Sequence, residues 1–515
     1  MRADLIKKYN FSYDDGYGTV IGEYDAPWSQ KQGIICLDLL KQGNLLIYGQ
    51  PGSGKDNIIS TIIYDLSLRK SPDDINFYIG DFGAETLRTF KKIPQVGDVF
   101  TIDDFDKIQN LIKMLDKELD RRKKTYADYG GSYEEYYKLT GNKEAVIVTA
   151  LNNYENFLET YPKFYDIFTG LFRDGAKYGL LFIVTTTVSN AVRSKVAQCF
   201  YNKICLKMSN DFDYRELLGA PKGMVPADNY GRGVISVNGD DSCYEFQSVM
   251  ISPKDNRTQF LKDVSSDLCK SYTTRAKKIP ILPEVAYVDD VLYELKGLNC
   301  VPIGIEKNSL EVYVFSFMEL KVNLIAAKSI RSHVYFIYAL IREMLLIENV
   351  NVIIVDALNI YRGKYDNVTL YNDNLDEAFE NIYYNVQNDQ SSTKTNVYFC
   401  LGINEFKNNI SSKYSEYFEE LFKGVSKCSN NTFLFFDDSN NYKQLQLEKW
   451  YNENVNNTFG IWLGEDIGVQ VALGVMSLTI EDKQNIFPCI GYPIYQGKHM
   501  TIKYVVDGVD KEDEE

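Results

Sequence analysis

The sequence predicts an α/β fold of two tandem domains, each with a mainly parallel sheet and helices on both faces. Its 515 residues exceed what one hydrophobic core usually serves, since cores stop growing near about 250–300 residues. Short apolar runs alternate with segments of helical spacing in the first half, as in a parallel sheet buried on both faces. The second half repeats the order of these elements, which indicates two copies of one domain.

The first copy contains the clearest strands and helices. Continuous apolar runs predict strands at residues 44–48, 75–80, 145–151 and 180–185. Helices are expected at Lys55–Arg69 and at residues 101–126, where Ile108, Leu111, Ile112, Leu115 and Leu119 recur at helical spacing. A polar segment over residues 252–285 places the domain boundary near residue 275, so we expect domains at residues 1–275 and 276–506. Residues 507–515 are an acidic tail expected to stay solvated.

The second copy keeps five landmarks of the first in order. The strand beginning at Asn44 has its counterpart at Asn323, and the strand ending at Asp81 has its counterpart at Asp356. In the same alignment residues 150–153 correspond to residues 402–405. Order and spacing are preserved although the residues differ, so we expect the two domains to share one topology.

Composition and charge exclude several functions. The formal net charge of −15 argues against a nucleic-acid-binding surface, which needs a basic face. A local basic groove could still exist within a chain that is acidic overall. Two histidines argue against a histidine-based metal site, and nine cysteines without CxxC spacing are typical of reduced thiols in a cytosolic protein. No apolar run reaches 18 residues and the start has no signal-peptide pattern.

The strongest chemical signal is a glycine-rich loop between a predicted strand and a predicted helix. It consists of Gly49, Gln50, Pro51, Gly52, Ser53, Gly54, Lys55 and Asp56 and nearly fits the phosphate-loop pattern G-x-x-x-x-G-K-[ST]. Its glycines let backbone amides surround phosphate oxygens, the helix N-terminus adds partial positive charge, and Lys55 would contact the β- and γ-phosphates. ATP is therefore the expected ligand. The alternative is a structural turn in which Lys55 is merely exposed.

Two departures from that pattern concern catalysis. Position 56 is Asp56 where Ser or Thr would ligate Mg²⁺; its carboxylate could hold Mg²⁺ but would bring negative charge near the phosphates. After the predicted strand at residues 145–151 the chain has Asn152 and Asn153 instead of the acidic pair that positions the metal's water shell and polarises water. Amides cannot act as a base, so we expect nucleotide binding with weak or absent hydrolysis.

The second copy is further degraded at the corresponding positions. The alignment places Ala327 at the position of Gly49, Ser332 at that of Gly54 and His333 at that of Lys55. Without glycines the loop cannot easily present its amides, so we expect no phosphate site there. Glu405 is aligned with the water-polarising acid but has no phosphate loop to serve.

These motifs together resemble the FtsK/SpoIIIE-type P-loop ATPases, and within them the EssC/EccC motors of type VII secretion. The resemblance covers nearly the whole chain. Besides the loop, it rests on residues 21–27, 81–87, 185–190, 209–219, 231–233 and 460–464 and on Gln470.

The resemblance implies the second and third ATPase domains of a longer, membrane-anchored hexameric motor, on the cytoplasmic side of the membrane. The implied partners are further subunits, membrane components of the secretion system, and small secreted helical hairpins with a Trp-x-Gly turn. The last domain of such motors receives the substrate tail, and Trp450 and Trp462 could line a pocket for it, although Trp at the end of an element is more often core. Two alternatives stay open: a DNA translocase, as elsewhere in this family, and a nucleotide-free scaffold.

Overall fold

The computed structural model describes residues 1–26, 30–236, 243–253, 256–291, 300–389, 394–479, 482 and 487–507. The chain divides into two compact units, Met1–Ile281 and Leu282–Glu515, called here the first and second units. No helix among the described residues is both long and apolar enough to span a bilayer.

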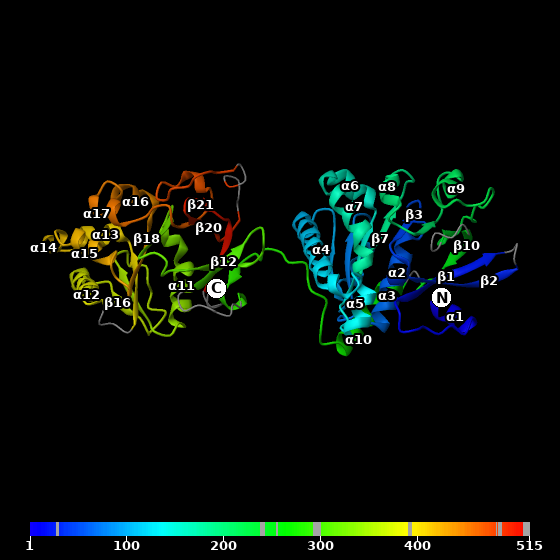
Figure 1. Cartoon of the computed structure of the whole chain (residues 1–515), viewed down its shortest axis with the longest axis horizontal. Helices are drawn as coiled ribbons and strands as arrows, with labels where there is room; N and C mark the ends of the chain where they lie inside the picture. Colours follow the sequence, from blue (N-terminus) through cyan, green and yellow to red (C-terminus); the bar gives the residue numbers. More distant parts are fainter. Residues whose placement is uncertain are drawn as a thin grey trace. The chain divides into compact units, whose positions relative to one another are not determined.

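The first unit contains a ten-stranded sheet in the order β2-β1-β10-β9-β8-β3-β7-β6-β4-β5. Figure 1 labels its strands β1, β2, β3, β7 and β10. From β8 to β5 neighbouring strands run parallel, and from β2 to β8 they run antiparallel. The strands are β1 (Gly18–Ala26), β2 (Lys31–Asp38), β3 (Leu45–Tyr48), β4 (Ile75–Asp81), β5 (Val96–Phe100), β6 (Val146–Asn152), β7 (Leu180–Thr186), β8 (Asn202–Cys205), β9 (Arg232–Ser236) and β10 (Cys243–Ser248). The helices are α1 (Arg2–Lys8), α2 (Leu39–Gln42), α3 (Lys55–Arg69), α4 (Phe105–Tyr126), α5 (Tyr133–Thr140), α6 (Tyr154–Thr160), α7 (Tyr165–Asp174), α8 (Ser194–Ala197), α9 (Phe212–Leu218) and α10 (Arg257–Ser271). The strands and helices predicted in this half are confirmed within a few residues.

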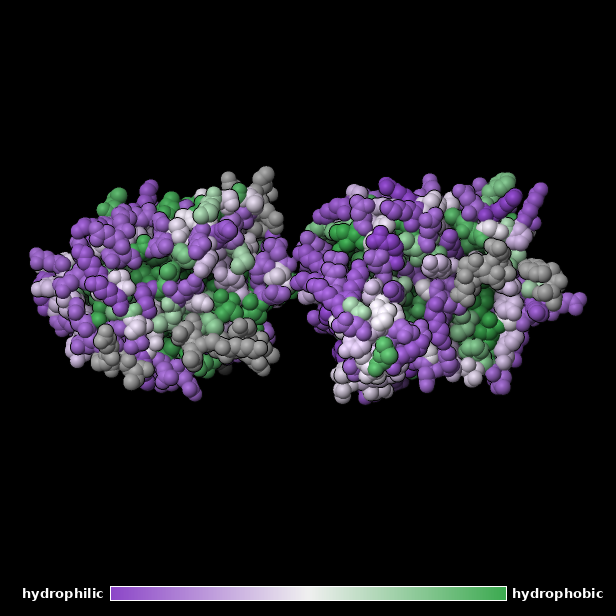
Figure 2. Space-filling model, in the orientation of Figure 1, coloured by the Kyte–Doolittle hydropathy of each residue, from purple (hydrophilic) through white to green (hydrophobic). Residues whose placement is uncertain are grey.

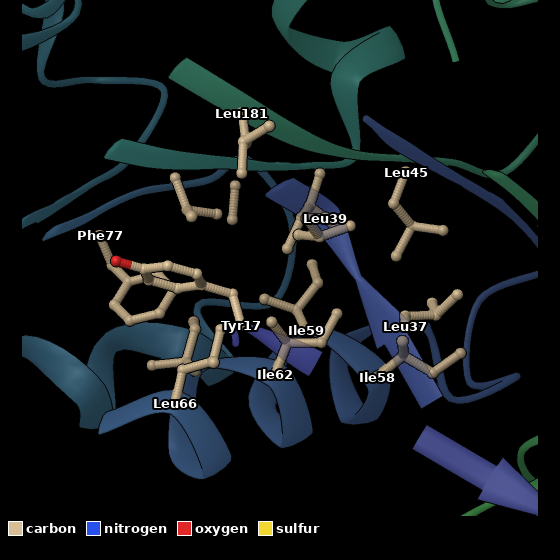
Figure 3. Close-up of a cluster of buried hydrophobic side chains, with 14 of the residues drawn as sticks. Tyr17, Leu37, Leu39, Leu45, Ile58, Ile59, Ile62, Leu66, Phe77 and Leu181 are labelled. Carbon is tan, nitrogen blue, oxygen red and sulfur yellow. The ribbon is translucent and has the colours of Figure 1, made fainter. Parts of the chain in front are cut away.

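Two hydrophobic cores lie on opposite faces of this sheet. Leu45 and Ile47 of β3 belong to one core with Ile58, Ile59, Ile62 and Leu66 of helix α3. Figure 3 shows Leu45 on the side of this core opposite the helix. Leu46 and Tyr48 face the opposite core, together with residues of α4, α6 and α7. Successive strand residues alternate between faces, so a continuous apolar run is what a strand covered on both sides requires.

The second unit has a sheet in the order β13-β12-β22-β20-β19-β14-β18-β17-β15-β16, with the same parallel and antiparallel portions. Its strands are β11 (Ala286–Tyr287), β12 (Val301–Glu306), β13 (Val312–Phe315), β14 (Val322–Ala327), β15 (Val350–Asp356), β16 (Thr369–Tyr371), β17 (Thr395–Leu401), β18 (Asn431–Asp438), β19 (Gly460–Leu463), β20 (Ile490–Tyr495), β21 (Lys498–His499) and β22 (Ile502–Val506). Its helices are α11 (Val334–Leu345), α12 (Leu375–Gln387), α13 (Ile403–Asn409), α14 (Ser412–Ser415), α15 (Phe418–Val425), α16 (Ser439–Leu445) and α17 (Lys449–Asn454). The equivalent strands thus follow the same order in both sheets.

The alternation of faces aligns the two units residue by residue. Ile325 of β14 faces α11 as Ile47 of β3 faces α3, which agrees with the alignment of Ala327 with Gly49. The alignment of Asn323 with Asn44 is wrong by one residue, because it would place Ile47 opposite Ala326, which faces the other core. The strands β6 and β17 are also equivalent. The residues that follow them, Asn153 and Gly402, both have a left-handed backbone and both precede a helix. Gly402 therefore corresponds to Asn153, three residues from its place in the sequence alignment.

The last described residues correct the expected tail at its first position. Asp507 follows β22 and is buried, with its carboxylate paired with Arg342 at 3.0 Å and with Lys364 at 2.5 Å. A buried carboxylate with two cationic partners belongs to the packed unit, so Asp507 is not solvated. Residues 508–515 and residue 27 lie outside the described part of the chain, and the domain bounds at residues 275 and 506 stay predictions.

Candidate nucleotide-binding site

The glycine-rich loop lies at the carboxyl end of β3, in the centre of the first unit's sheet. The amide of Gly49 donates to the carbonyl of Thr186 at 3.1 Å, and the amide of Gln50 donates to the carbonyl of Lys207 at 2.8 Å. These bonds attach the start of the loop to the ends of the neighbouring strands. Helix α3 begins at Lys55, so the amides of its first turn lie at the end of the loop, where an anion would be stabilised.

Two glycines of the loop are required by its geometry. A Cβ at Gly49 would lie 2.5 Å from the hydroxyl oxygen of Ser53 and 3.0 Å from the Cβ of Leu206, so a side chain there would have to displace its neighbours. Gly54 has φ +108°, and a Cβ there would lie 3.2 Å from the backbone of Gly231. The loop therefore excludes larger residues at both positions, as a backbone cradle for phosphate does.

Lys55 is buried and directed back across the loop. Its Nζ donates to the carbonyl of Gly49 at 2.5 Å and to that of Gln50 at 3.2 Å. Burial lowers the pKa of Lys55, while Glu155 and Asp56 act in the opposite direction. A buried ammonium group inside an amide-lined loop is suited to contact a phosphate, which contradicts the alternative of a merely exposed lysine.

Two buried polar atoms at the site have no hydrogen-bond partner in the described part of the chain: Oγ of Ser53 and Oε2 of Glu155. Glu155 lies in the first turn of α6, and its other oxygen accepts from the amide of Thr187 at 2.8 Å and from its hydroxyl at 2.5 Å. Buried polar groups are normally paired, so these atoms fit a site that receives a polar ligand. The loop, Lys55 and Ser53 together fit a nucleotide phosphate.

The positions expected to hold the catalytic acids contain a closed polar network. The side-chain amide of Asn152 donates to Asp81 at 3.0 Å, and its oxygen accepts from the hydroxyl of Thr185 at 2.6 Å. Asp81 also accepts from the amide of Leu87 at 2.9 Å. Asn153 donates its backbone amide to Thr185 at 2.9 Å. The structure thus brings Asn152 and Asn153 to the expected place, where their hydrogen bonds link three strands.

Asp56 lies in the first turn of α3 beside a cation. Nη1 of Arg257, the first residue of α10, is 3.5 Å from its Oδ2, and the hydroxyl of Thr86 is 3.4 Å from the same oxygen. Arg257 also donates to the hydroxyl of Ser60, which donates to the carbonyl of Asp56 at 2.6 Å. Asp56 is thus one half of an ion pair.

The second unit has an anion of its own at the corresponding loop. The carboxylate of Asp438, at the end of β18, accepts from the amide of Ile330 at 2.7 Å. Ile330 occupies the position of Gly52, and Ser332 and His333 end the short 3-10 turn that replaces the glycine loop. Burial lowers the pKa of His333 to about 4, and its Nδ1 is 2.9 Å from the hydroxyl of Tyr504. A neutral, hydrogen-bonded histidine cannot replace Lys55 as a phosphate ligand.

The remaining predicted residues of the second unit lie elsewhere than expected. Glu405 aligns with Asn156 rather than with Asn153, because Gly402 is the residue that follows the strand. Trp450 and Trp462 are only 4% and 1% exposed, and Trp450 packs against Phe418 and Phe422. Both indoles are core residues rather than walls of an open pocket.

Sequence reasoning missed three residues of these sites: Glu155, Arg257 and Asp438. Glu155 follows the expected strand by only a few residues, so an acid search just beyond Asn153 could have found it. Arg257 is 201 residues from Asp56 and carried no local signal. Asp438 lies 108 residues from Ile330 and is equally invisible to spacing arguments.

Comparison with known proteins assigns the class of this site. Residues 21–219 match the FtsK/SpoIIIE family, and that range contains the loop, Asn152, Asn153 and Glu155. The first unit therefore contains an FtsK/SpoIIIE domain, a P-loop fold whose family implies nucleotide binding.

More particularly, the chain is similar to the EssC proteins of type VII secretion. It is 24% identical over 393 residues to the type VII secretion system protein EssC of Staphylococcus aureus strain MRSA252. The aligned region covers 73% of this chain and 25% of that protein. The chain thus spans about a quarter of the length of this curated relative.

Two solved structures share the two-unit fold. EssC (ATPases 2 and 3) from Geobacillus thermodenitrificans superposes with a TM-score of 0.81 at 20% identity, covering 96% of this chain and 98% of that one. Thermomonospora curvata EccC (ATPases 2 and 3), in complex with a signal sequence peptide, gives a TM-score of 0.57 at 16% identity, covering 97% and 94%. The predicted fold class, two tandem P-loop-type α/β domains, is confirmed.

Proposed function

We propose that this chain is the ATP-binding and substrate-recognition module of a type VII secretion motor, on the cytoplasmic side of the membrane. One nucleotide binds, at residues 49–56 of the first unit. The observation that carries the proposal is the contrast between an amide-lined loop with a buried Lys55 and a second loop that already holds the carboxylate of Asp438.

The residues that would hold the nucleotide are those of the loop itself. The amides of the loop and of the first turn of α3 would surround the phosphates, and Lys55 would contact the terminal ones. Bound ATP supplies the phosphoanhydride whose hydrolysis drives motors of this kind. Turnover is expected to be very slow, because Asn152 and Asn153 cannot accept the proton of an attacking water.

Glu155 is the acid that could support residual turnover. It affects the pKa of Lys55, and it is oriented by two hydrogen bonds from Thr187. Its buried, unpartnered oxygen is available, within the described part of the chain, to a water or ligand. Glu155→Gln is therefore expected to lower turnover further while leaving ATP affinity within about twofold.

Titration of the chain with a fluorescent ATP analogue tests the binding site. We expect micromolar or tighter affinity, one site per chain, and loss of binding in Lys55→Ala. The matched control is Lys41→Ala, an exposed lysine outside the loop. Absence of binding by the unaltered chain would favour a nucleotide-free scaffold, and rapid hydrolysis at low micromolar protein would contradict the slow turnover.

A DNA translocase remains the competing function, and the charges of the best basic cluster speak against it. Arg121 pairs with Glu118 at 2.7 Å and with Glu144 at 2.5 Å. Arg122 is buried and donates to the carbonyls of Tyr178 and Ala145. These cations are used within the first unit and do not form a track for phosphates. A gel shift with duplex DNA at physiological salt is expected to show no complex.

For substrate recognition, the second unit offers an apolar surface beside α16. Leu447, Val469 and Val471 are 87%, 61% and 42% exposed. The side-chain amide of Gln446 holds their segments together by donating to the carbonyls of Val471 and Ala472 at 3.2 and 3.1 Å. Figure 2 shows green, hydrophobic areas among the hydrophilic residues of the face that it draws. An exposed apolar surface such as that of Leu447, Val469 and Val471 suits the apolar side of a helical peptide. A relative of the same fold was solved with a signal sequence peptide, which supports a peptide ligand.

A pull-down against small secreted helical-hairpin proteins of the same genome tests this surface. Replacing Leu447 and Val471 by Asp is expected to abolish capture without lowering the melting temperature, since both side chains are exposed. Leu346→Asp is the matched control, because Leu346 is 67% exposed on another element of the same unit. Capture that survives deletion of the second unit would refute the placement.

A further inference from the structure

The position that ordinarily supplies a Mg²⁺ ligand in a phosphate loop is Asp56 in this chain. A Ser or Thr hydroxyl there binds the metal, which in turn bridges the phosphates. A carboxylate is a good Mg²⁺ ligand in isolation, so the substitution alone does not exclude the metal. What decides the question is the set of groups around Asp56.

Asp56 is already engaged by a cation from a distant element. Arg257 lies 3.5 Å from its Oδ2 and is itself anchored by its bond to Ser60. Tyr230 is close to the same pair: burial raises its pKa, Asp56 raises it further, and Arg257 lowers it. The guanidinium is thus held at the first turn of α3 by several contacts.

The other oxygen ligands that a metal would use are bonded to protein. Asp81 accepts from Asn152 and from the amide of Leu87. The oxygen of Asn152 accepts from Thr185. Mg²⁺ at a nucleotide is held by one or two side chains besides the phosphates, and here each candidate, Asp56, Asp81 and Asn152, already has a protein partner. The residues present therefore do not fit the Mg²⁺ that the fold family implies.

Charge supplies the reason that a phosphate could still bind. Asp56 alone would repel the β- and γ-phosphates, but its pairing with Arg257 offsets that charge locally. A guanidinium also donates in a planar fork that matches phosphate oxygens, and it keeps its charge at every physiological pH. Arg257 thus has the chemistry needed beside the triphosphate.

We infer that Arg257, held by Asp56, serves in place of the divalent cation, so that the first unit binds a nucleoside triphosphate without Mg²⁺. The inference rests on the proposed ATP site and adds the identity of its counter-charge. It makes Arg257 a binding residue contributed by α10, outside the segment that the phosphate-loop motif covers.

The test is a titration of the full chain with a fluorescent ATP analogue, in EDTA and in millimolar Mg²⁺. We expect the two dissociation constants to agree within about twofold. Arg257→Gln is expected to weaken binding in EDTA by about tenfold or more. Arg257→Lys keeps the charge but not the planar pair of donors, and is expected to weaken binding by only about threefold. Arg275→Gln, at an exposed arginine of the same unit, is the matched control.

The outcomes separate this inference from the proposed function. Binding that Mg²⁺ tightens tenfold or more, or Arg257→Gln binding as the unaltered chain does, overturns the inference and leaves the ATP site standing. Binding under neither condition overturns both. Thermal melting of each variant without nucleotide shows whether the chain is folded, and Arg257→Lys carries the test if Arg257→Gln is not.

Discussion

The loop after β3 and the loop after β14 occupy the same place in two sheets of identical strand order, yet they present opposite charges to the space above them. In the first unit the loop offers amides and Lys55. In the second unit the carboxylate of Asp438 bonds an amide of the loop, and His333 is neutral. The second loop therefore contains, as a side chain, the kind of anion that we propose the first loop binds from solution.

This difference shows how one fold can be kept in a unit that has no site for the ligand. Loop amides at the start of a helix need an acceptor, whether a phosphate, water or a side chain. Asp438 meets that need from within the chain, so the unit requires no nucleotide to complete its loop. Four experiments test this contrast, beginning with the one in which we expect the greatest change.

Removing a core aromatic of the second unit is expected to have the largest effect. Trp450→Ala deletes a buried ring that packs against Phe418 and Phe422, and should lower the unfolding free energy of that unit by about 3–5 kcal/mol. Trp450→Phe, which keeps most of the packing, should lose less. Denaturant unfolding measures both; ATP affinity lost together with stability would show that the first unit depends on the second.

Lys55→Ala tests whether the first loop alone binds nucleotide. Loss of a charged contact to phosphate should cost about 2–3 kcal/mol, or roughly 30–150-fold in affinity. Calorimetric titration should show the dissociation constant rising by this factor. Nucleotide bound with unchanged affinity would have to be in the second unit, which contradicts the assignment of Asp438 as its internal anion.

Asp437 gives the second unit a pH dependence that the first lacks at the equivalent Thr186. Burial raises its pKa to about 6, above the unfolded value, so the folded state favours the protonated form. The stabilisation that protonated Asp437 gives to the folded state is present at low pH and is lost as the pH rises through about 6. This loss lowers the unfolding free energy by about 2–3 kcal/mol.

Denaturant unfolding at pH 4 and pH 7.5 checks this dependence, because these values enclose the rise of the pKa from 3.8 to about 6, and Asp437→Asn is expected to flatten it. Asp466→Asn, in an exposed turn of the same unit, is the control. An unchanged pH profile in Asp437→Asn would contradict the assignment.

Asp438→Asn should have the smallest effect. It removes the charge from the hydrogen bond to Ile330 and should lower stability by about 1–2 kcal/mol. No nucleotide binding is expected to appear, because Ala327, Ser332 and His333 cannot form the cradle. Thermal melting and an ATP titration measure the two results; a gain of binding would mean that the carboxylate alone had excluded the phosphate.

Much of the fold was predictable from sequence. The helix Lys55–Arg69 has the predicted ends, because a glycine loop and an apolar periodicity mark them locally. The equivalence of Asn153 with Gly402 was not predictable, because low similarity permits a shift of three residues. Only the strand ends and the left-handed residue after each of them fix it.

By itself, the sequence determined the two copies, the phosphate loop at residues 49–56 and the absence of the acidic pair at Asn152 and Asn153. These are local patterns of backbone conformation and side-chain chemistry. The tertiary structure decided that Arg257 pairs with Asp56, that Asp438 bonds the second loop, and that Trp450 and Trp462 are core. Pairing between charges far apart in the chain depends on how elements pack, and no spacing rule encodes it.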